Sequence, residues 1–129
     1  MFNANAYDYI NVLDKAADAS WLRESTITNN IANVDTPGYK RQDVDFESML
    51  KRELTNSKYT SLDSKVSKVN LSDLNATTYT DSANYSYRLD GNNVDIDTEE
   101  AELASEQIRY SGLTDSISQE ISRMKTVMK

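Results

Sequence analysis

Apolar and small side chains recur at heptad spacing near the start of the chain, between residues 5 and 34. The positions follow one another in alternating steps of four and three residues, interrupted once at Glu24: Ala6, Ile10, Leu13, Ala17, Ser20, Ile27, Ile31 and Val34. This period predicts a helix over residues 5–33 whose apolar stripe faces another helix, as in a coiled coil. A plain amphipathic helix packed on a local core has the same period, so that interpretation stays open.

A second heptad pattern runs from about Asp97 to the end of the chain. Its apolar positions repeat every seven residues, with further positions between them: Leu103, Tyr110, Ile117 and Met124, then Thr114, Ile121 and Met128. Asp97 followed by Glu100 has the spacing of a capping box, which predicts that the helix begins there. Acidic residues crowd the start of this stretch and basic residues its end, and both arrangements are stabilised by the helix dipole.

The sequence that follows the first pattern predicts a helix stop and then a short helix. Asparagines at 29, 30 and 33 compete with helical hydrogen bonds, and Pro37-Gly38 suits the two central positions of a type II turn, where the glycine has a positive φ. Met49, Leu50 and Leu54 then share one face of a short helix after Asp45. We expect this helix to fold back and cover part of a neighbouring apolar surface.

The middle of the chain is polar. Residues 55–84 are rich in Ser, Thr, Asn and Asp and predict a loop with weak local structure. Residues 85–89 alternate, Asp90-Gly91 is a turn signal, and Val94 and Ile96 alternate again, so a small hairpin or extended loop is expected. The predicted fold is mainly α, with two long terminal helices as a coiled-coil-like core (residues 1–33 and 97–129). A linker (residues 34–96) holds the turn, short helix, polar loop and hairpin.

Charge and composition exclude several classes of function. Of 129 residues, 14 are basic and 21 acidic, with a net charge of −7, and there is no basic stripe to neutralise nucleic-acid phosphates. Histidine and cysteine are absent, which removes the usual activated nucleophiles and thiolate ligands. The acidic residues are expected to be solvated, so no carboxylate pair is singled out. We therefore expect no enzyme activity, catalytic residue, cofactor, metal ion or small-molecule substrate.

Two features of the sequence bear on its location. No apolar run approaches the ~20 residues that span a bilayer, so direct membrane insertion is not expected. The first ten residues carry neither a positive charge nor an apolar core, so a cleavable secretory signal is not expected either. Both features fit a cytoplasmic protein, or one exported by a route that removes nothing.

Two separated segments resemble the flagellar rod and hook axial protein family. The first, residues 21–40, ends in Asn29-Asn30-Ile31-Ala32-Asn33-Val34-Asp35-Thr36-Pro37-Gly38-Tyr39-Lys40 and is similar to the general family signature. The second, residues 87–104, begins Tyr87-Arg88-Leu89-Asp90-Gly91-Asn92-Asn93-Val94-Asp95-Ile96-Asp97. Together with Asp43-Val44-Asp45-Phe46, it resembles the members that form the proximal rod. Another rod-family axial protein, or a generic coiled-coil adaptor, is the alternative.

The resemblance implies a structural subunit of the flagellar basal body, exported through the flagellar type III system without signal cleavage. Its terminal helices would pack with those of neighbouring copies around the central export channel and transmit torque. Its partners would be itself, other rod proteins, the MS ring and the export-gate adaptor. Two groups of residues would carry this role. The turn motif comprises Asn29, Asn30, Ile31, Ala32, Asn33, Asp35, Thr36, Pro37, Gly38 and Tyr39. The assembly seam comprises Ile10, Leu13, Ile27, Ile31, Leu103, Tyr110, Ile117, Ile121, Met124 and Met128.

Overall fold

The computed structural model describes residues 5–55, 61–81 and 88–128. Two long helices dominate it, α1 (Asn5–Ala32) and α4 (Ile96–Val127), which confirms the two predicted terminal helices. The shorter elements lie between them in the chain: β1 (Gln42–Asp45), α2 (Glu47–Thr55), α3 (Leu62–Ser67), a 3-10 helix η1 (Leu71–Asp73) and β2 (Thr77–Thr80).

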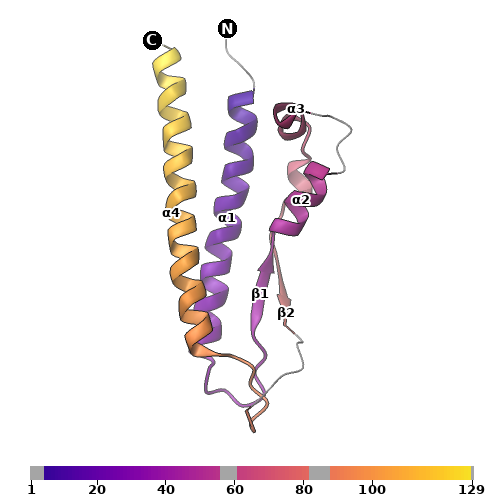
Figure 1. Ribbon diagram of the computed structural model, residues 1–129, viewed down its shortest axis with the longest axis vertical. Helices are drawn as coiled ribbons and strands as arrows, with labels where there is room; N and C mark the ends of the chain where they lie inside the picture. The colour runs from indigo at the N-terminus through magenta and orange to yellow at the C-terminus, as the bar shows by residue number, and fades with distance from the viewer. Residues whose placement is uncertain (1–4, 56–60, 82–87, 129) are drawn as a thin grey trace.

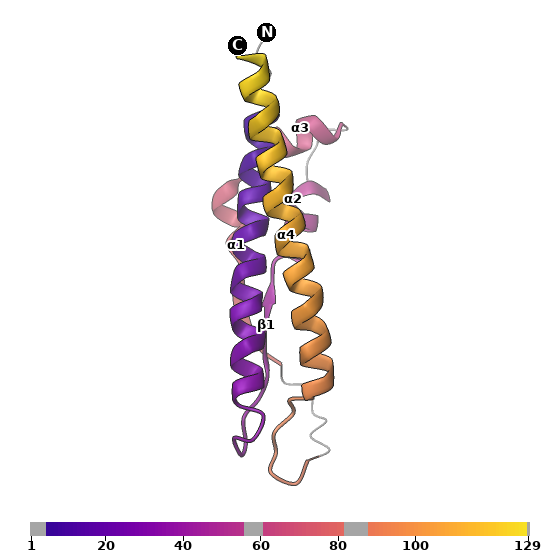
Figure 2. The same cartoon turned by 90° about the vertical axis from the view of Figure 1, so that its left-hand side faces the viewer.

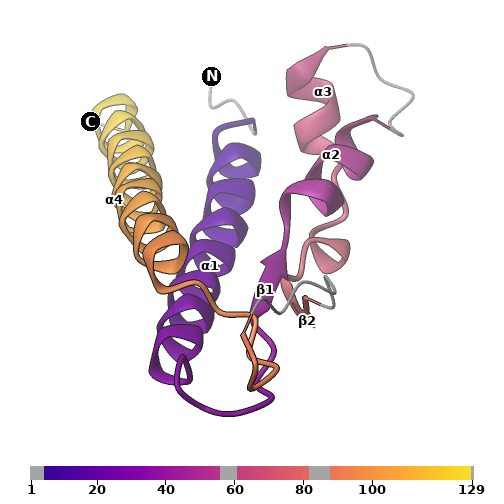
Figure 3. The ribbon, with the colours of Figure 1, turned by 60° about the horizontal axis from the view of Figure 1, so that its bottom comes forward.

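Helix α1 is the central element of the molecule. Helix α4 runs antiparallel along one side of it, and the segment from β1 to β2 covers another side (Figures 1 and 3). The start of α1 and the end of α4 therefore lie at one end of the molecule, and the loops after α1 and before α4 lie at the other, here called the loop end (Figure 1). At 1.5 Å per residue the two helices are about 40–50 Å long.

The face of α4 toward α1 is marked by buried and half-buried side chains in steps of three and four. It includes predicted seam positions and positions that were not predicted: Glu99, Leu103, Glu106, Tyr110, Leu113, Ile117, Glu120 and Met124. Two predicted seam residues lie off this face, since Ile121 is 40% and Met128 is 68% exposed. The contact of α4 with α1 is therefore rotated slightly from the predicted seam.

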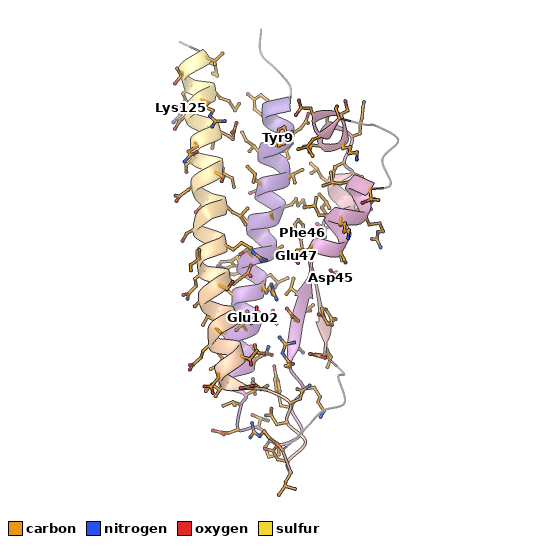
Figure 4. The ribbon with its side chains drawn as sticks, in the orientation of Figure 1. Tyr9, Asp45, Phe46, Glu47, Glu102 and Lys125 are labelled. Atoms are coloured by element: carbon orange, nitrogen blue, oxygen red, sulfur yellow. The ribbon has the colours of Figure 1, made fainter. Side chains whose placement is uncertain are left out.

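The side of α1 that faces the linker carries a small apolar core. Ala19 packs there with Phe46 and Leu74, and Leu50 of α2 lies against the same cluster. Helix α2 thus folds back onto an apolar surface, as the sequence predicts. Figure 4 shows Phe46 and Glu47 beside α1, where β1 passes into α2.

The prediction of a loop with weak local structure over residues 55–84 is wrong for the residues described there. Helix α3, η1 and β2 all lie in this segment, and Leu74 and Val66 are only 1% and 7% exposed. Ser61 caps α3 and Asn70 caps η1 by accepting backbone N–H bonds. Isolated apolar residues are enough to order these short elements because α1 supplies the surface that buries them.

The two strands do not lie where the sequence predicts them. β1 pairs antiparallel with β2, with Gln42 opposite Thr80 and Asp45 opposite Thr77. Of the expected strand, residues 85–87 lie outside the described part of the chain, and residues 88–90 form a bend and turn. The turn at Asp90-Gly91 is confirmed, since Gly91 has a φ of +77°.

Helix α4 begins slightly earlier than the predicted capping box. Its N-cap is Asp95, whose side chain accepts the backbone N–H of Asp97 and the hydroxyl of Thr98. Asp97 lies in the first turn instead. Both aspartates satisfy the local rule for a cap, and in the structure Asp95 takes this position.

Candidate functional site

The two signature segments meet at the loop end of the molecule. The backbone N–H of Tyr39 bonds to the carbonyl of Thr36 at 3.2 Å, and Gly38 has a φ of +73°, which confirms the predicted turn at Pro37-Gly38. Gly38 in turn donates its N–H to the carbonyl of Asp90 at 2.7 Å. The signatures are thus two halves of one structure, joined by backbone hydrogen bonds.

Asn92 from the second signature closes the end of α1. Its side-chain Nδ2 lies 2.9, 3.0 and 2.9 Å from the carbonyl oxygens of Asn33, Val34 and Thr36, and its Oδ1 accepts the N–H of Val94. The residue is 0% exposed. One buried amide from a distant loop thus contacts three carbonyls of the turn that follows α1, in addition to the donors those carbonyls already have, and holds the two segments together.

Asn30 has a tertiary role that the sequence analysis missed. It is 0% exposed, donates Nδ2 to the carbonyl of Gln42 at 2.7 Å and accepts the N–H of Gln42 at 2.9 Å. The Tyr39 hydroxyl and a Glu99 carboxylate oxygen complete its bonding. The helix continues through Asn30 to Ala32, so this asparagine does not stop α1. It holds the start of β1 against the helix.

Two buried glutamates fasten α4 to the rest of the subunit, which corrects the expectation that acidic side chains are solvated. Glu99, 1% exposed, contacts Arg41 at 2.6 Å. Glu106, 2% exposed, accepts the Ser20 hydroxyl at 2.6 Å and contacts Arg23 at 3.3 Å. Charge-assisted bonds of this kind compensate the cost of burying carboxylates.

The two arginines connect these glutamates to β1. Arg23 contacts Asp43 at 3.0 Å, and Arg41 contacts Asp43 at 3.4 Å and Asp81 at 2.8 Å. Burial by itself lowers the pKa of the Arg41 guanidinium, but its hydrogen bonds to Asp81 and Glu99 outweigh that, so its pKa is raised. The pKa of Arg23 is raised in the same way, against its own burial, by Asp43 and Glu106. Both arginines therefore stay charged at every pH at which the carboxylates are ionised. The network stays intact over that pH range.

The predicted assembly seam is buried to different degrees along its length. Ile27, near the loop end, is 1% exposed. Most other seam residues are half-buried: Ile10, Leu13, Ile31, Leu103, Tyr110, Ile117 and Met124. Ile121 and Met128 are exposed at the opposite end of the molecule. Within one subunit, therefore, the contact of α1 with α4 leaves Ile121 and Met128 of the predicted seam uncovered by the described residues.

The described residues offer little for chemistry. A recess of about 180 Å³ lies between α1, α4 and the β1–α2 corner, bounded by Phe46, Leu50 and Leu113 among others. It is smaller than the 300–1,000 Å³ typical of cofactor and ligand pockets. The part of the chain that the structure describes holds no cluster of three potential metal ligands. None of its helices is long and apolar enough to cross a membrane.

The turn at Gly38 permits a matched test. An added Cβ at Gly38 would meet no heavy atom within 4 Å, so Gly38→Ala acts only through the positive φ, which costs roughly 1–2 kcal/mol for an L-residue. Gly112 lies in α4 with equally open surroundings, and Gly112→Ala should stabilise by about 1 kcal/mol. Urea denaturation of the two variants should shift the midpoint in opposite directions. Equal shifts would contradict the turn.

Comparison of the sequence with known proteins finds a family model and several relatives. The family model described as "Flagella basal body rod protein" matches residues 11–40, which include the first signature. The flagellar basal body rod protein FlgB of Bacillus subtilis is 36% identical over 117 residues, covering 90% of this chain and 89% of that protein. FlgB of Borrelia hermsii is 36% identical, with 96% and 93% covered. FlgB of Escherichia coli K12 is 31% identical, with 83% of each covered.

These similarities span both terminal helices and the linker, and they define the class of protein. It is a structural rod subunit of the bacterial flagellar basal body. Within that class the chain belongs to the FlgB family of flagellar basal body rod proteins.

Proposed function

We propose that this subunit builds the proximal rod and that its terminal helices, residues 1–33 and 97–129, form the inner layer around the export channel. The observation that carries this proposal is the pair of exposed seam residues Ile121 and Met128, on a long helix whose first half is fastened to the subunit by the buried Glu99 and Glu106. A helix mainly gains stability by burying its apolar face, and neighbouring copies would supply that burial. The linker, residues 34–96, would form the outer layer.

The buried ion network gives the subunit a rigid body with which to transmit torque. Arg23 and Arg41 tie α1, β1 and α4 together through buried carboxylates, so the part of the subunit from its middle to the loop end resists sliding of one helix past the other. In this proposal the partners are other copies of the chain, other rod proteins, the MS ring and the export-gate adaptor. The subunit would reach them through the flagellar type III system without a cleaved signal.

Ile117→Asp tests whether the seam is needed for assembly. Ile117 is half-buried toward α1 in the part of α4 that lacks the ion network. A carboxylate there would lie unpaired in an apolar contact, which costs several kcal/mol per site when that contact is sealed by neighbours. We expect cells that express and export the variant but build no rod beyond the MS ring, as seen by electron microscopy of basal bodies.

Two substitutions serve as controls for Ile117→Asp. Ser116→Asp places the same charge at an exposed position one residue away, and rods should form normally. Ile117→Leu keeps the apolar surface and should also assemble. Full filaments on cells that carry Ile117→Asp would contradict the buried seam.

A further inference from the structure

The two-stranded sheet of this subunit has one closed edge and one open edge. The outer edge of β1 is closed by Asn30, whose side chain accepts the N–H of Gln42 at 2.9 Å and donates to its carbonyl at 2.7 Å, as a neighbouring strand would. Figures 1 and 3 show β2 on the side of β1 away from α1 and α4, and in Figure 2, seen from the helix side, both long helices lie in front of the strands. A further strand can therefore join this sheet only at β2.

The backbone of β2 presents hydrogen-bonding groups on its open edge. Asp81, directly after β2, donates its N–H to the carbonyl of Arg41 at 2.8 Å, so the N–H of Asp81 points toward the strand that includes β1. The direction of the backbone groups alternates along a strand, so those of Thr78 and Thr80 point away from β1. Within the described part of the chain, no hydrogen bond is made to the outward N–H and C=O groups of these two threonines.

The sequence of β2 does not protect this edge. The strand reads Thr-Thr-Tyr-Thr and pairs with β1 in continuous register, and its side chains are exposed, that of Tyr79 to 49%. Threonine and tyrosine both favour strands. Proteins usually interrupt an open edge with lysine, proline or a bulge, because its free N–H and C=O groups pair with any strand that arrives. β2 carries none of these three features and is therefore free to pair with another strand.

The open edge is complementary to itself. When a second β2 lies antiparallel beside the first and Tyr79 faces its counterpart, Thr78 of each copy lies opposite Thr80 of the other. Each of these threonine pairs exchanges two N–H···O bonds, so the outward groups of both residues are paired. The two tyrosines form the closely spaced, non-hydrogen-bonded pair at the centre, where opposite aromatic side chains stabilise a sheet. Asp81 lies opposite Thr77 in this register, so no two carboxylates face each other across the new ladder.

We infer that the free subunit forms a closed dimer by pairing β2 with β2 of a second copy, in one antiparallel sheet of order β1-β2-β2-β1. The contact is isologous, because the same edge serves both copies. Asn30 closes the outer edge of β1 in each copy, so no further copy can be added. The dimer covers a strand that would otherwise be a template for aggregation. A pair that does not propagate is a state of the free subunit, and this inference does not rest on the proposed role in the rod.

A single cysteine tests the register of this dimer. The chain has no cysteine, so Tyr79→Cys introduces one thiol per copy. Opposite Cα atoms in a non-hydrogen-bonded antiparallel pair are about 4.5 Å apart, which a disulfide can span. The matched control is Thr77→Cys, an exposed position on the same face of β2 whose counterparts would lie roughly 14 Å apart. Purified full-length protein, oxidised with copper phenanthroline and run on a denaturing gel without reductant, should give a dimer band for Tyr79→Cys and monomer for the control.

Sedimentation equilibrium measures the pairing without a cross-link. A contact made by so short a strand belongs to the weak, transient class, so the weight-average mass of the unsubstituted protein should rise with concentration from 14.6 kDa toward twice that value. Thr78→Pro removes one outward N–H but no N–H that points toward β1, and its mass should stay that of one chain. Thr78→Val keeps the N–H and a β-branched side chain and should associate like the unsubstituted protein. Equal circular dichroism of the three proteins excludes unfolding as the cause.

Several results would overturn the dimer. They are equal dimer bands from the two cysteine variants, the mass of one chain at every concentration of the unsubstituted protein, masses beyond two chains, or unchanged association of Thr78→Pro. If Thr78→Pro does not fold, the comparison of Tyr79→Cys with Thr77→Cys decides. These measurements use the purified chain, whereas the proposed function is tested in basal bodies, so either can fail without the other.

Discussion

Replacing Asn92 with aspartate should remove most of the stability of the loop end. The side chain keeps its shape, but a carboxylate oxygen takes the place of the amide that donates to the carbonyls of Asn33, Val34 and Thr36. A buried charge would then face carbonyl oxygens at about 3 Å. An uncompensated buried charge costs about 3–5 kcal/mol, and Arg88, which also donates to the Val34 carbonyl, would offset part of that cost. Urea denaturation followed by circular dichroism measures the loss.

The effect of Asn92→Asp should depend on pH in a known direction. Protonation makes the introduced carboxyl neutral and lets it donate one hydrogen bond again, so the folded state raises the pKa of that carboxyl. The stability difference from the unsubstituted protein should therefore shrink as the pH falls and reach its full size above the raised pKa. Asn11→Asp, at an exposed position of α1, should change stability by no more than about 0.5 kcal/mol at any pH. Equal effects of the two substitutions would refute the capping role of Asn92.

Replacing Arg23 with methionine should detach α4 from α1 at the middle of the subunit. Arg23 contacts Asp43 at 3.0 Å and Glu106 at 3.3 Å, and Glu106 is 2% exposed. Methionine keeps much of the volume but leaves the carboxylates without this cation. Removing one partner of a buried ion pair costs about 3–5 kcal/mol, because the other charge stays buried. Thermal unfolding should show a correspondingly large drop in midpoint.

A double-mutant cycle with Glu106→Gln separates the charge from the packing. Glutamine is neutral and can still accept the Ser20 hydroxyl, so Arg23→Met should cost much less in that background. Arg123→Met is the matched control for the arginine, since Arg123 is 71% exposed in its pair with Glu120 and should lose at most about 1 kcal/mol. If the cost of Arg23→Met is unchanged by Glu106→Gln, the buried pair does not hold the helices together.

The features that could be predicted from the sequence are those whose cause lies within a few residues. Heptad spacing is sufficient to predict the two long helices, because the apolar stripe repeats along each helix regardless of which element packs on it. The turn at Pro37-Gly38 is also local, since proline restricts φ and glycine alone adopts a positive φ without strain. Residues 47–55 formed the expected short helix for the same reason.

The buried glutamates could not be predicted in this way. Glu99 and Glu106 lie seven residues apart on the same face of α4 as Leu103, a spacing that could have marked them as part of the seam. Their partners, Arg41 and Arg23, are 58 and 83 residues away in the chain. Without the fold, nothing indicates that the charges meet, so a solvated face was the ordinary expectation. The same holds for Asn30 and Asn92, whose partners are backbone groups of other segments.

The sequence by itself therefore determined the helical frame, the turn at its end and, through the two signatures, the family. The tertiary structure alone decided which polar groups are buried, because burial depends on surfaces that come together from distant segments. It placed β1 against β2, moved the start of α4 to Asp95, and ordered α3 and η1 on the flank of α1.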